Sequence, residues 1–143
     1  MSRRDSILTC TGAHIALAHT VLGSCAFIEA LGFCLLLHYR RVVKNHVAGY
    51  PEEWWPSVSA TIGDWYPERN VFQLICATAS GFRFLMVALC ATIPYMRGRV
   101  VSALSLLLVG LLRTIACGGW IFITSSDDAF VHDVTMGTYL ALT

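Results

Sequence analysis

Three ionisable residues lie inside long apolar stretches of the sequence: Glu29, Arg83 and Arg113. A charged side chain at the centre of a membrane helix costs about 2.5 to 3.5 kcal/mol on insertion scales, so such residues usually face a partner or a water-filled cavity. One carboxylate between two guanidinium groups leaves net positive charge, which suits an anionic ligand such as a lipid phosphate. The alternatives are a Glu–Arg pair that only fixes helix register, with the second arginine reaching toward water, or a stretch that does not cross a membrane.

The three charges are expected at a similar depth. Each lies about nine to twelve residues from the end of its apolar stretch that leads toward residues 39–70. At 1.5 Å per helical residue, this separation corresponds to about 14 to 18 Å for Glu29, Arg83 and Arg113 alike. We therefore predict that the three residues share one polar site and take part in substrate binding.

The overall composition indicates a membrane protein. Of the 143 residues, 56% are hydrophobic and 13% are charged, whereas soluble domains usually carry about 25% charged residues. The net charge of +1 and the lack of a basic stripe argue against nucleic acid as a partner. The apolar residues form long blocks rather than a short repeating pattern. We predict an all-α fold, a polytopic transmembrane helix bundle.

Three blocks are long enough to cross a bilayer as helices, which takes about 20 apolar residues each. They cover about residues 15–38, 71–94 and 100–123, and a fourth block starts near residue 131. As a helix, the remaining residues of the fourth block reach only about 20 Å, which is too short to span. We expect a single but incomplete multispan domain over residues 1–143, with three full spans and the start of a fourth.

The segment between the first two spans, residues 39–70, is rich in aromatic and proline residues. Trp and Tyr favour the headgroup layer of a membrane, so this segment is expected to lie on the membrane surface. Three of its charged residues would then stand above the buried charges as further substrate-binding candidates: Asp64, Glu68 and Arg69. The alternative is an aromatic belt in which the charged residues are incidental. Asn70 is expected to cap the second span.

A second polar group follows the third span. His132 beside Asp133 is a candidate catalytic pair, because a histidine next to a carboxylate suits proton transfer. The alternative is ordinary turn chemistry, with Ser125, Ser126 or Asp128 as the N-cap of the fourth helix. The six cysteines form no CxxC pair, and no nucleotide-binding, metalloprotease or nucleophile-elbow motif is present. The sequence therefore predicts no metal site and no cofactor.

Several blocks of the sequence resemble the FRAG/DRAM/Sfk family of multispan proteins. The longest is YPEEWWPSVSATIGDWYPERN over residues 50–70, and FRFL at 82–85, LRT at 112–114 and CGGW at 117–120 extend the match. The acidic turn that leads to His132 belongs to it as well. Within the family, the chain is similar to the amino-terminal membrane region of fungal Cwh-type proteins, which remodel the lipids of GPI anchors.

The resemblance implies a multi-pass protein of the endoplasmic reticulum membrane, with the Golgi as a further location, and a module of about six spans. It implies a role in exchanging the diacylglycerol of GPI anchors for ceramide, a step linked to cell wall integrity. The implied partners are GPI-anchored proteins, membrane lipids and a carboxyl-terminal remodelase part, in cis or in trans. Residues 39–70 would face the lumen, an orientation that the balanced counts of Lys and Arg leave open.

Two functions from different classes follow from the resemblance. The first is the membrane module of a lipid remodelling protein, which we expect to be inactive without its catalytic portion. The second is a non-catalytic scaffold that sorts or presents GPI-anchored proteins and lipids. A role in stress or autophagy, as in other branches of the family, is a third interpretation, and it fits the block over residues 50–70 less well.

Overall fold

The computed structural model describes residues 3–43, 54–63 and 65–143, with side chains from residue 12 onward. All regular structure in these ranges is helical, which confirms the predicted all-α class. The elements in chain order are α1 (Arg3–Phe33), a π-helical turn η1 (Cys34–His38), α2 (Tyr39–Val42), α3 (Val58–Gly63), α4 (Glu68–Met96), α5 (Val100–Phe122) and α6 (Ala129–Ala141).

Three of the helical stretches are long and apolar enough to cross a membrane. They are Gly12–Val42, Glu68–Met96 and Val100–Phe122, of 31, 29 and 23 residues. At 1.5 Å per residue, each exceeds the roughly 30 Å thickness of a hydrocarbon core. The 13 residues of α6 reach about 20 Å and do not cross by themselves. The chain is therefore a multi-pass membrane protein, with three candidate spans among the residues that the structure describes.

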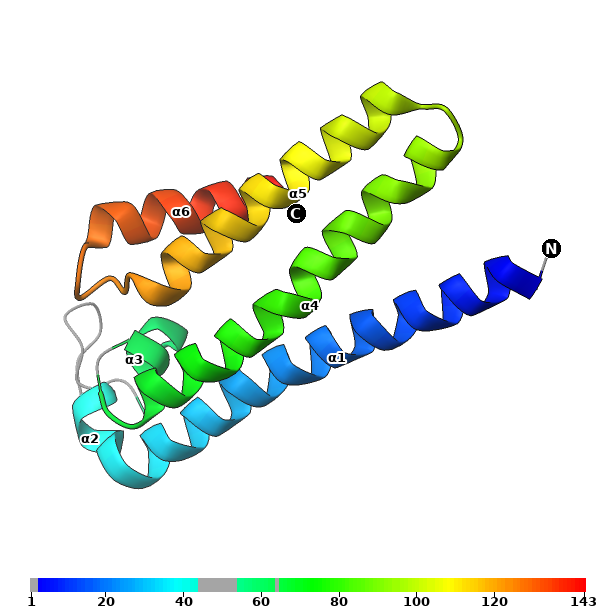
Figure 1. Ribbon diagram of the computed structural model, residues 1–143. Helices are drawn as coiled ribbons and strands as arrows, with labels where there is room; N and C mark the ends of the chain where they lie inside the picture. The colour runs from blue at the N-terminus through cyan, green and yellow to red at the C-terminus, as the bar shows by residue number, and fades with distance from the viewer. Residues whose placement is uncertain (1–2, 44–53, 64) are drawn as a thin grey trace.

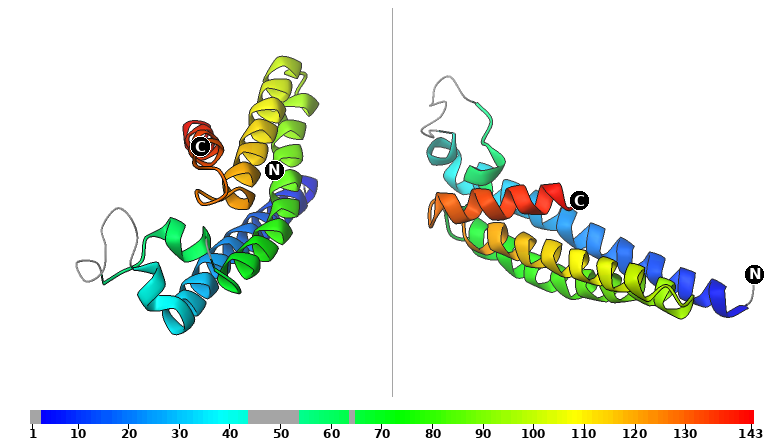
Figure 2. Two further views of the ribbon diagram at one scale, coloured as in Figure 1. Left: turned by 90° about the vertical axis from the view of Figure 1, so that its left-hand side faces the viewer. Right: turned by 90° about the horizontal axis from the view of Figure 1, so that it is seen from above.

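The long helices lie side by side, and their connections gather at two opposite ends (Figure 1). Helices α2 and α3 and the α5–α6 turn occupy one end, whereas the α4–α5 turn lies at the other (Figures 1 and 2). Gly98 allows the tight α4–α5 turn, because its φ of 73° is a conformation that side chains with a Cβ rarely adopt. Helix α6 folds back along α5. We call the end that carries α2, α3 and the α5–α6 turn the loop face.

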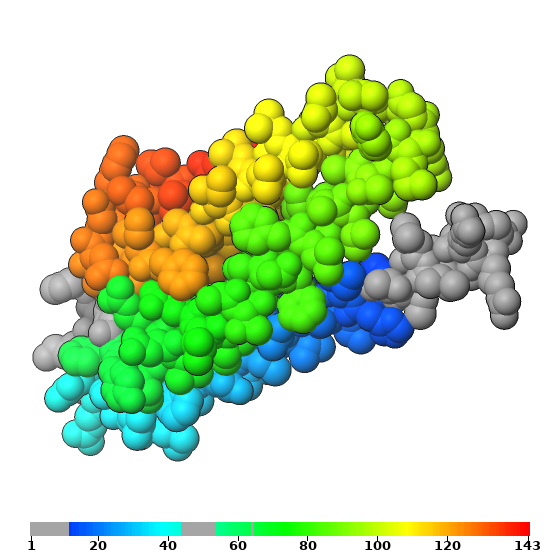
Figure 3. Space-filling model, viewed as in Figure 1, coloured from blue at the N-terminus to red at the C-terminus, as the bar shows by residue number. Residues whose placement is uncertain are grey.

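Small side chains let α1 pack closely against α4. Ala26, Ala30 and Cys34 follow one another at four-residue spacing on α1, and each is 0% exposed. Ala26 and Ala30 belong to the same buried core cluster as Phe72 and Cys76 of α4, and this core lies nearer the loop face. The two helices touch along this stretch in the space-filling view (Figure 3). Close contact of small residues is the usual basis of helix association in lipid, where apolar surface alone gives no driving force.

Two glycines permit the close approach of the later helices. A Cβ added at Gly110 would lie 2.7 Å from a methyl group of Val87, so this glycine allows α5 to approach α4. A Cβ at Gly119 would lie 2.5 Å from the side chain of Thr135, so that glycine allows α6 to approach α5. Because of these two glycines, α4, α5 and α6 lie close enough together for their polar side chains to make contacts.

The helix boundaries differ from the sequence prediction at the start of α4. The helix begins at Glu68 after the N-cap Pro67, so Asn70 is not its cap. Proline suits a helix start because it lacks the N–H that would be unpaired there, and Glu68 in the first turn interacts favourably with the helix dipole. At α6, the N-cap is Asp128, one of the three predicted candidates, and its side chain accepts a hydrogen bond from the Val131 N–H.

Candidate functional site

Arg83 of α4 and Arg113 of α5 converge on one aromatic ring within the bundle. Each guanidinium carbon lies 5.7 Å from the centre of the Tyr139 ring of α6. Arg83 also donates a hydrogen bond from Nε to Nε2 of His19 on α1, at 3.0 Å. A cation over an aromatic face is attracted by the ring quadrupole, more strongly where water is excluded. The structure thus brings together two of the three charges that the sequence analysis grouped.

Glu29 does not join these two arginines, so the predicted three-residue cluster is wrong in this respect. Its side chain is exposed, and no ion pair links it to Arg83 or Arg113 in the described part of the chain. The reason is helix geometry: Ala26 and Ala30 turn toward α4, and Glu29, one position before Ala30, points about 100° away from that contact.

The two arginines therefore form a positively charged site within the described residues. The ion pairs found there involve other residues, so neither Arg83 nor Arg113 has a carboxylate partner among them. His19 accepts the Arg83 hydrogen bond through Nε2 and is thus neutral, because a protonated imidazole has no lone pair to offer. Two guanidinium groups without a counter-charge suit a phosphate or another anion.

Arg83 and Arg113 also line a pocket of about 380 Å³. Most of its lining residues are apolar; the residues that line it are Arg83, Met86, Val87, Cys90, Leu106, Val109, Gly110, Arg113, Thr114 and Leu142. An apolar wall with a few placed charges is typical of sites for amphipathic ligands. We call this the arginine site.

A second polar group lies at the loop face, where the end of α1 meets the start of α4. Glu68 is fully buried, and its Oε1 lies 2.7 Å from Nδ1 of His38. Its other oxygen, Oε2, is buried without a hydrogen-bond partner in the described part of the protein. The His38 ring stacks on Trp65 at 5.5 Å between ring centres, and Arg41 lies over the same Trp65 ring at 4.9 Å. An unpaired buried oxygen costs about 1 to 3 kcal/mol, and more when charged.

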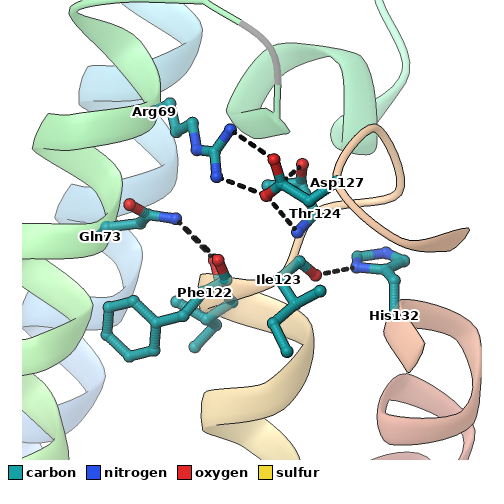
Figure 4. Close-up of polar contacts among 8 residues, drawn as sticks. Arg69, Gln73, Phe122, Ile123, Thr124, Asp127 and His132 are labelled. Atoms are coloured by element: carbon teal, nitrogen blue, oxygen red, sulfur yellow. Dashed lines mark hydrogen bonds and ion pairs between the residues drawn. The ribbon is translucent and has the colours of Figure 1, made fainter.

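Arg69 connects the start of α4 to the α5–α6 turn (Figure 4). Both of its terminal nitrogens donate to the Asp127 carboxylate, and this carboxylate also accepts from the backbone N–H and the hydroxyl of Thr124, each at 3.1 Å. The Arg69 hydrogen bond and then the Thr124 N–H lower the pKa of Asp127 below its ordinary value. One turn further on, Gln73 donates to the Ile121 carbonyl at 3.1 Å. Polar contacts therefore connect the start of α4 to the end of α5 and to the α5–α6 turn.

His132 and Asp133, the predicted catalytic pair, face different surroundings. His132 is buried at 5% exposure, and its Nδ1 lies 2.9 Å from the Ile123 carbonyl oxygen (Figure 4). Because a carbonyl only accepts, Nδ1 carries the proton and a neutral ring keeps its lone pair on Nε2. Asp133 is exposed. The contact satisfies a carbonyl at the end of α5, and a role in proton transfer stays a prediction.

The remaining predicted residues are placed as follows. Asp64 lies outside the described residues. Glu68 and Arg69 belong to the first turn of α4 rather than to a loop above the arginine site. Trp54, Trp55 and Tyr66 are exposed, with 74%, 52% and 76% of their surface accessible, as interfacial aromatic residues would be. The described residues contain no group of three or more His, Cys, Asp or Glu that could hold a metal ion.

Sequence reasoning missed three residues that the structure places in polar contacts: His19, His38 and Tyr139. Both histidines lie within the first apolar stretch. An ionisable residue inside a span is a functional candidate by default, and that rule would have singled them out. Tyr139 carried no comparable signal, because one tyrosine in an apolar helix is ordinary and its contact with two arginines depends on how α6 folds back.

Two comparisons with known proteins found matches to this chain. A model of the Frag1/DRAM/Sfk1/Cwh43P N-terminal domain family matches residues 11–143. The protein cwh43 of Schizosaccharomyces pombe (strain 972 / ATCC 24843) is 46% identical over 141 residues. The match covers 98% of this chain but 14% of that protein, so the chain spans about one seventh of the length of the curated relative. No solved structure matches the chain.

Proposed function

The chain belongs to the Frag1/DRAM/Sfk1/Cwh43 N-terminal domain family, and on that premise we propose that it is the membrane module of a GPI-anchor lipid remodelling protein. The reaction served is the exchange of diacylglycerol for ceramide on GPI-anchored proteins, in the endoplasmic reticulum membrane. The observation that carries the proposal is the 46% identity to cwh43 along nearly the whole chain. Residues 50–70, which supplied the longest block of the resemblance, lie inside that match.

The arginine site supports a lipid as the ligand. Arg83 and Arg113 present two positive charges and line a mostly apolar pocket of about 380 Å³, and both lie within candidate spans. A molecule with an anionic group and acyl chains satisfies both features at once. The phosphate of a GPI-anchor lipid or of another anionic phospholipid has this chemistry. The module therefore holds the lipid, while the exchange requires the carboxyl-terminal part in cis or in trans.

The test replaces the matching segment of S. pombe cwh43 with this chain and expresses the chimera in cells that lack their own copy. Arg83→Leu and Arg113→Leu should each abolish ceramide-type anchors, because each removes half of the positive charge of the site. Mass spectrometry of the anchor lipids gives the readout, and immunoblotting of membranes checks insertion. The matched control is Arg97→Gln, an exposed arginine beyond the end of α4. Normal anchor lipids in both leucine variants would contradict the proposal that the arginine site binds the lipid.

A scaffold or sorting module is the second candidate, and the 14% coverage of the relative favours it, since most of that protein lies outside the match. In that case the chain presents GPI-anchored proteins or lipids to a catalytic part and takes no part in chemistry. Retargeting the rest of cwh43 to the membrane without this segment distinguishes the two. Restored ceramide-type anchors would establish the scaffold, whereas their absence would support the remodelling module.

A further inference from the structure

The His38–Glu68 pair at the loop face has features that the arginine site does not explain. Glu68 is fully buried with one oxygen on His38 Nδ1 at 2.7 Å and the other unpartnered among the described residues. Buried polar atoms without partners are rare, and each one calls for an explanation such as a chemical role. His38 remains partly accessible, with 19% of its side chain exposed. The pair therefore runs from the protein interior to the surface.

The backbone at this point departs from a regular α-helix. Residues Cys34–His38 form a π-helical turn, and His38 is its last residue. Single π-turns within α-helices are uncommon and frequently occur at functional sites, because the wider turn changes the direction in which the following side chains point. Here the turn ends on the one histidine that contacts the buried carboxylate of α4.

A surface pocket adjoins the histidine. It measures about 330 Å³ and is lined by residues 36–41, so that His38 shares it with Arg40 and Arg41. Both arginines are exposed, and the Arg41 guanidinium lies over the Trp65 ring. Together these residues offer a proton acceptor backed by a carboxylate and two positive charges within one pocket. That combination suits a phosphodiester and a hydroxyl group at the headgroup level of a membrane.

We infer that His38 is a general base that accepts the proton of a lipid hydroxyl at this pocket, with Glu68 as its positioning residue and Arg40 and Arg41 holding the phosphate. The inference rests on the proposed lipid exchange. The Glu68 carboxylate accepts the Nδ1 proton, which fixes the ring and leaves the lone pair on Nε2. A base held in this way by a buried carboxylate is a recurrent arrangement for activating hydroxyl groups.

The exchange step balances without a further reactant. The hydroxyl oxygen of the incoming ceramide forms a bond to the anchor phosphorus while its proton passes to Nε2 of His38. The bond between phosphorus and the diacylglycerol oxygen breaks, and the proton on Nε2 passes to that departing oxygen. One phosphodiester replaces another, nothing is oxidised or reduced, and the histidine returns to its starting form.

The pocket and the arginine site serve different molecules. Glu68 and Arg83 are fifteen positions apart on α4, which is about 22 Å along the helix axis. One phosphate cannot contact both sites over this distance. Ceramide and diacylglycerol are uncharged, so the anchor phosphate reacts at the His38 pocket and the arginine site holds a second, anionic phospholipid.

The test measures transfer of radiolabelled ceramide onto GPI-anchored proteins in membranes that contain the cwh43 chimera. General acid–base residues contribute about 10²- to 10⁴-fold to rates, so His38→Ala should lower transfer at least 100-fold. Added imidazole should restore part of it by entering the space that the side chain left. Glu68→Gln should lower the rate less than His38→Ala does, and Arg97→Gln should leave it unchanged.

The outcomes separate this inference from the proposed function. Wild-type transfer by His38→Ala and Glu68→Gln, together with loss in Arg83→Leu, would overturn the role of His38 and leave the lipid module intact. An inserted but inactive His38→Ala variant that imidazole does not restore would also overturn the role of His38. A histidine with a purely structural role would give this outcome, because free imidazole cannot replace its contacts. A wild-type chimera that transfers no ceramide would reject the proposed function itself.

Discussion

Glu68 and Arg69 are neighbours at the start of α4, yet they connect it to opposite sides of the bundle. Glu68 contacts the end of α1 through His38, whereas Arg69 contacts the α5–α6 turn through Asp127. Successive residues of an α-helix point about 100° apart, which is enough to send two adjacent side chains to different partners. The first pair is buried on the Glu68 side, at 0% exposure, and the second is open, with 41% of the Asp127 side chain exposed.

The comparison indicates that burial, rather than the presence of a charged pair, determines how much each contact contributes to the free energy of unfolding. Removing one partner of a buried pair leaves the other group desolvated and unpaired, whereas an exposed partner regains water. The His38–Glu68 contact is therefore expected to contribute to folding stability. It also suits chemistry, because the buried Glu68 carboxylate fixes the orientation of the His38 ring. The Arg69–Asp127 contact is expected to position the α5–α6 turn but to contribute little to the free energy of unfolding.

The largest effect is expected from breaking the buried pair. Glu68→Ala should lower the free energy of unfolding by about 1.5 to 3 kcal/mol, the net contribution of a hydrogen bond to a charged group. Unfolding of the purified chain with sodium dodecyl sulfate, from a mild detergent micelle, measures this change. Asp133→Ala, which removes an exposed carboxylate, is the control. A loss as small as that of the control would show that the buried pair has no special weight.

An intermediate effect is expected one turn along the same helix. Gln73 donates to the Ile121 carbonyl at 3.1 Å, near the end of α5, and Gln73→Ala should cost about 0.5 to 1.5 kcal/mol as one neutral hydrogen bond does. The same detergent titration gives the value. Thr78→Ala is the matched control on α4, because the Thr78 hydroxyl bonds only to the Leu74 carbonyl of its own helix. Equal losses for the two variants would contradict a contact between α4 and α5 at this position.

The smallest effect is expected at the exposed pair, and pH reveals it. The Arg69 hydrogen bond lowers the pKa of Asp127, so the contribution of the pair is present above the ordinary carboxyl value and is lost as pH falls through the lowered value. Arg69→Gln should raise the pKa of Asp127 toward that ordinary value and change stability less than Gln73→Ala. Carbon-13 NMR of labelled aspartate in micelles follows the titration. If the pKa of Asp127 were unchanged in Arg69→Gln, Arg69 would not be the cause of the lowered pKa.

The helices were largely predictable, because long apolar blocks have one stable form in a bilayer. The predicted span at about 71–94 falls inside α4, the one at about 100–123 ends one residue beyond α5, and the glycine turn separates the two helices. The ends were less predictable. Glu68 and Arg69 were expected in a surface segment because they are charged, but a charged residue can continue a helix beyond the apolar block when tertiary partners pair it, as His38 and Asp127 do.

The sites were predictable only in part. Depth along each helix follows from counting residues, and this count placed Arg83 and Arg113 at one level, where the structure has both over the Tyr139 ring. Direction around each helix axis does not follow from counting, since it depends on which face packs against a neighbour. Glu29 was grouped with the arginines for its depth, but the alanines of α1 face α4 and turn Glu29 away.

The sequence by itself determined that the chain is an all-helical membrane module, and its long block over residues 50–70 determined its family. These properties are local: hydrophobic length decides whether a segment crosses a bilayer, and a sequence match to a family needs no fold to be recognised. Only the tertiary structure decided that His38 meets Glu68 across thirty positions of sequence and that Tyr139 meets two arginines. Such pairings depend on the rotation and close approach of packed helices, which small residues permit but do not specify.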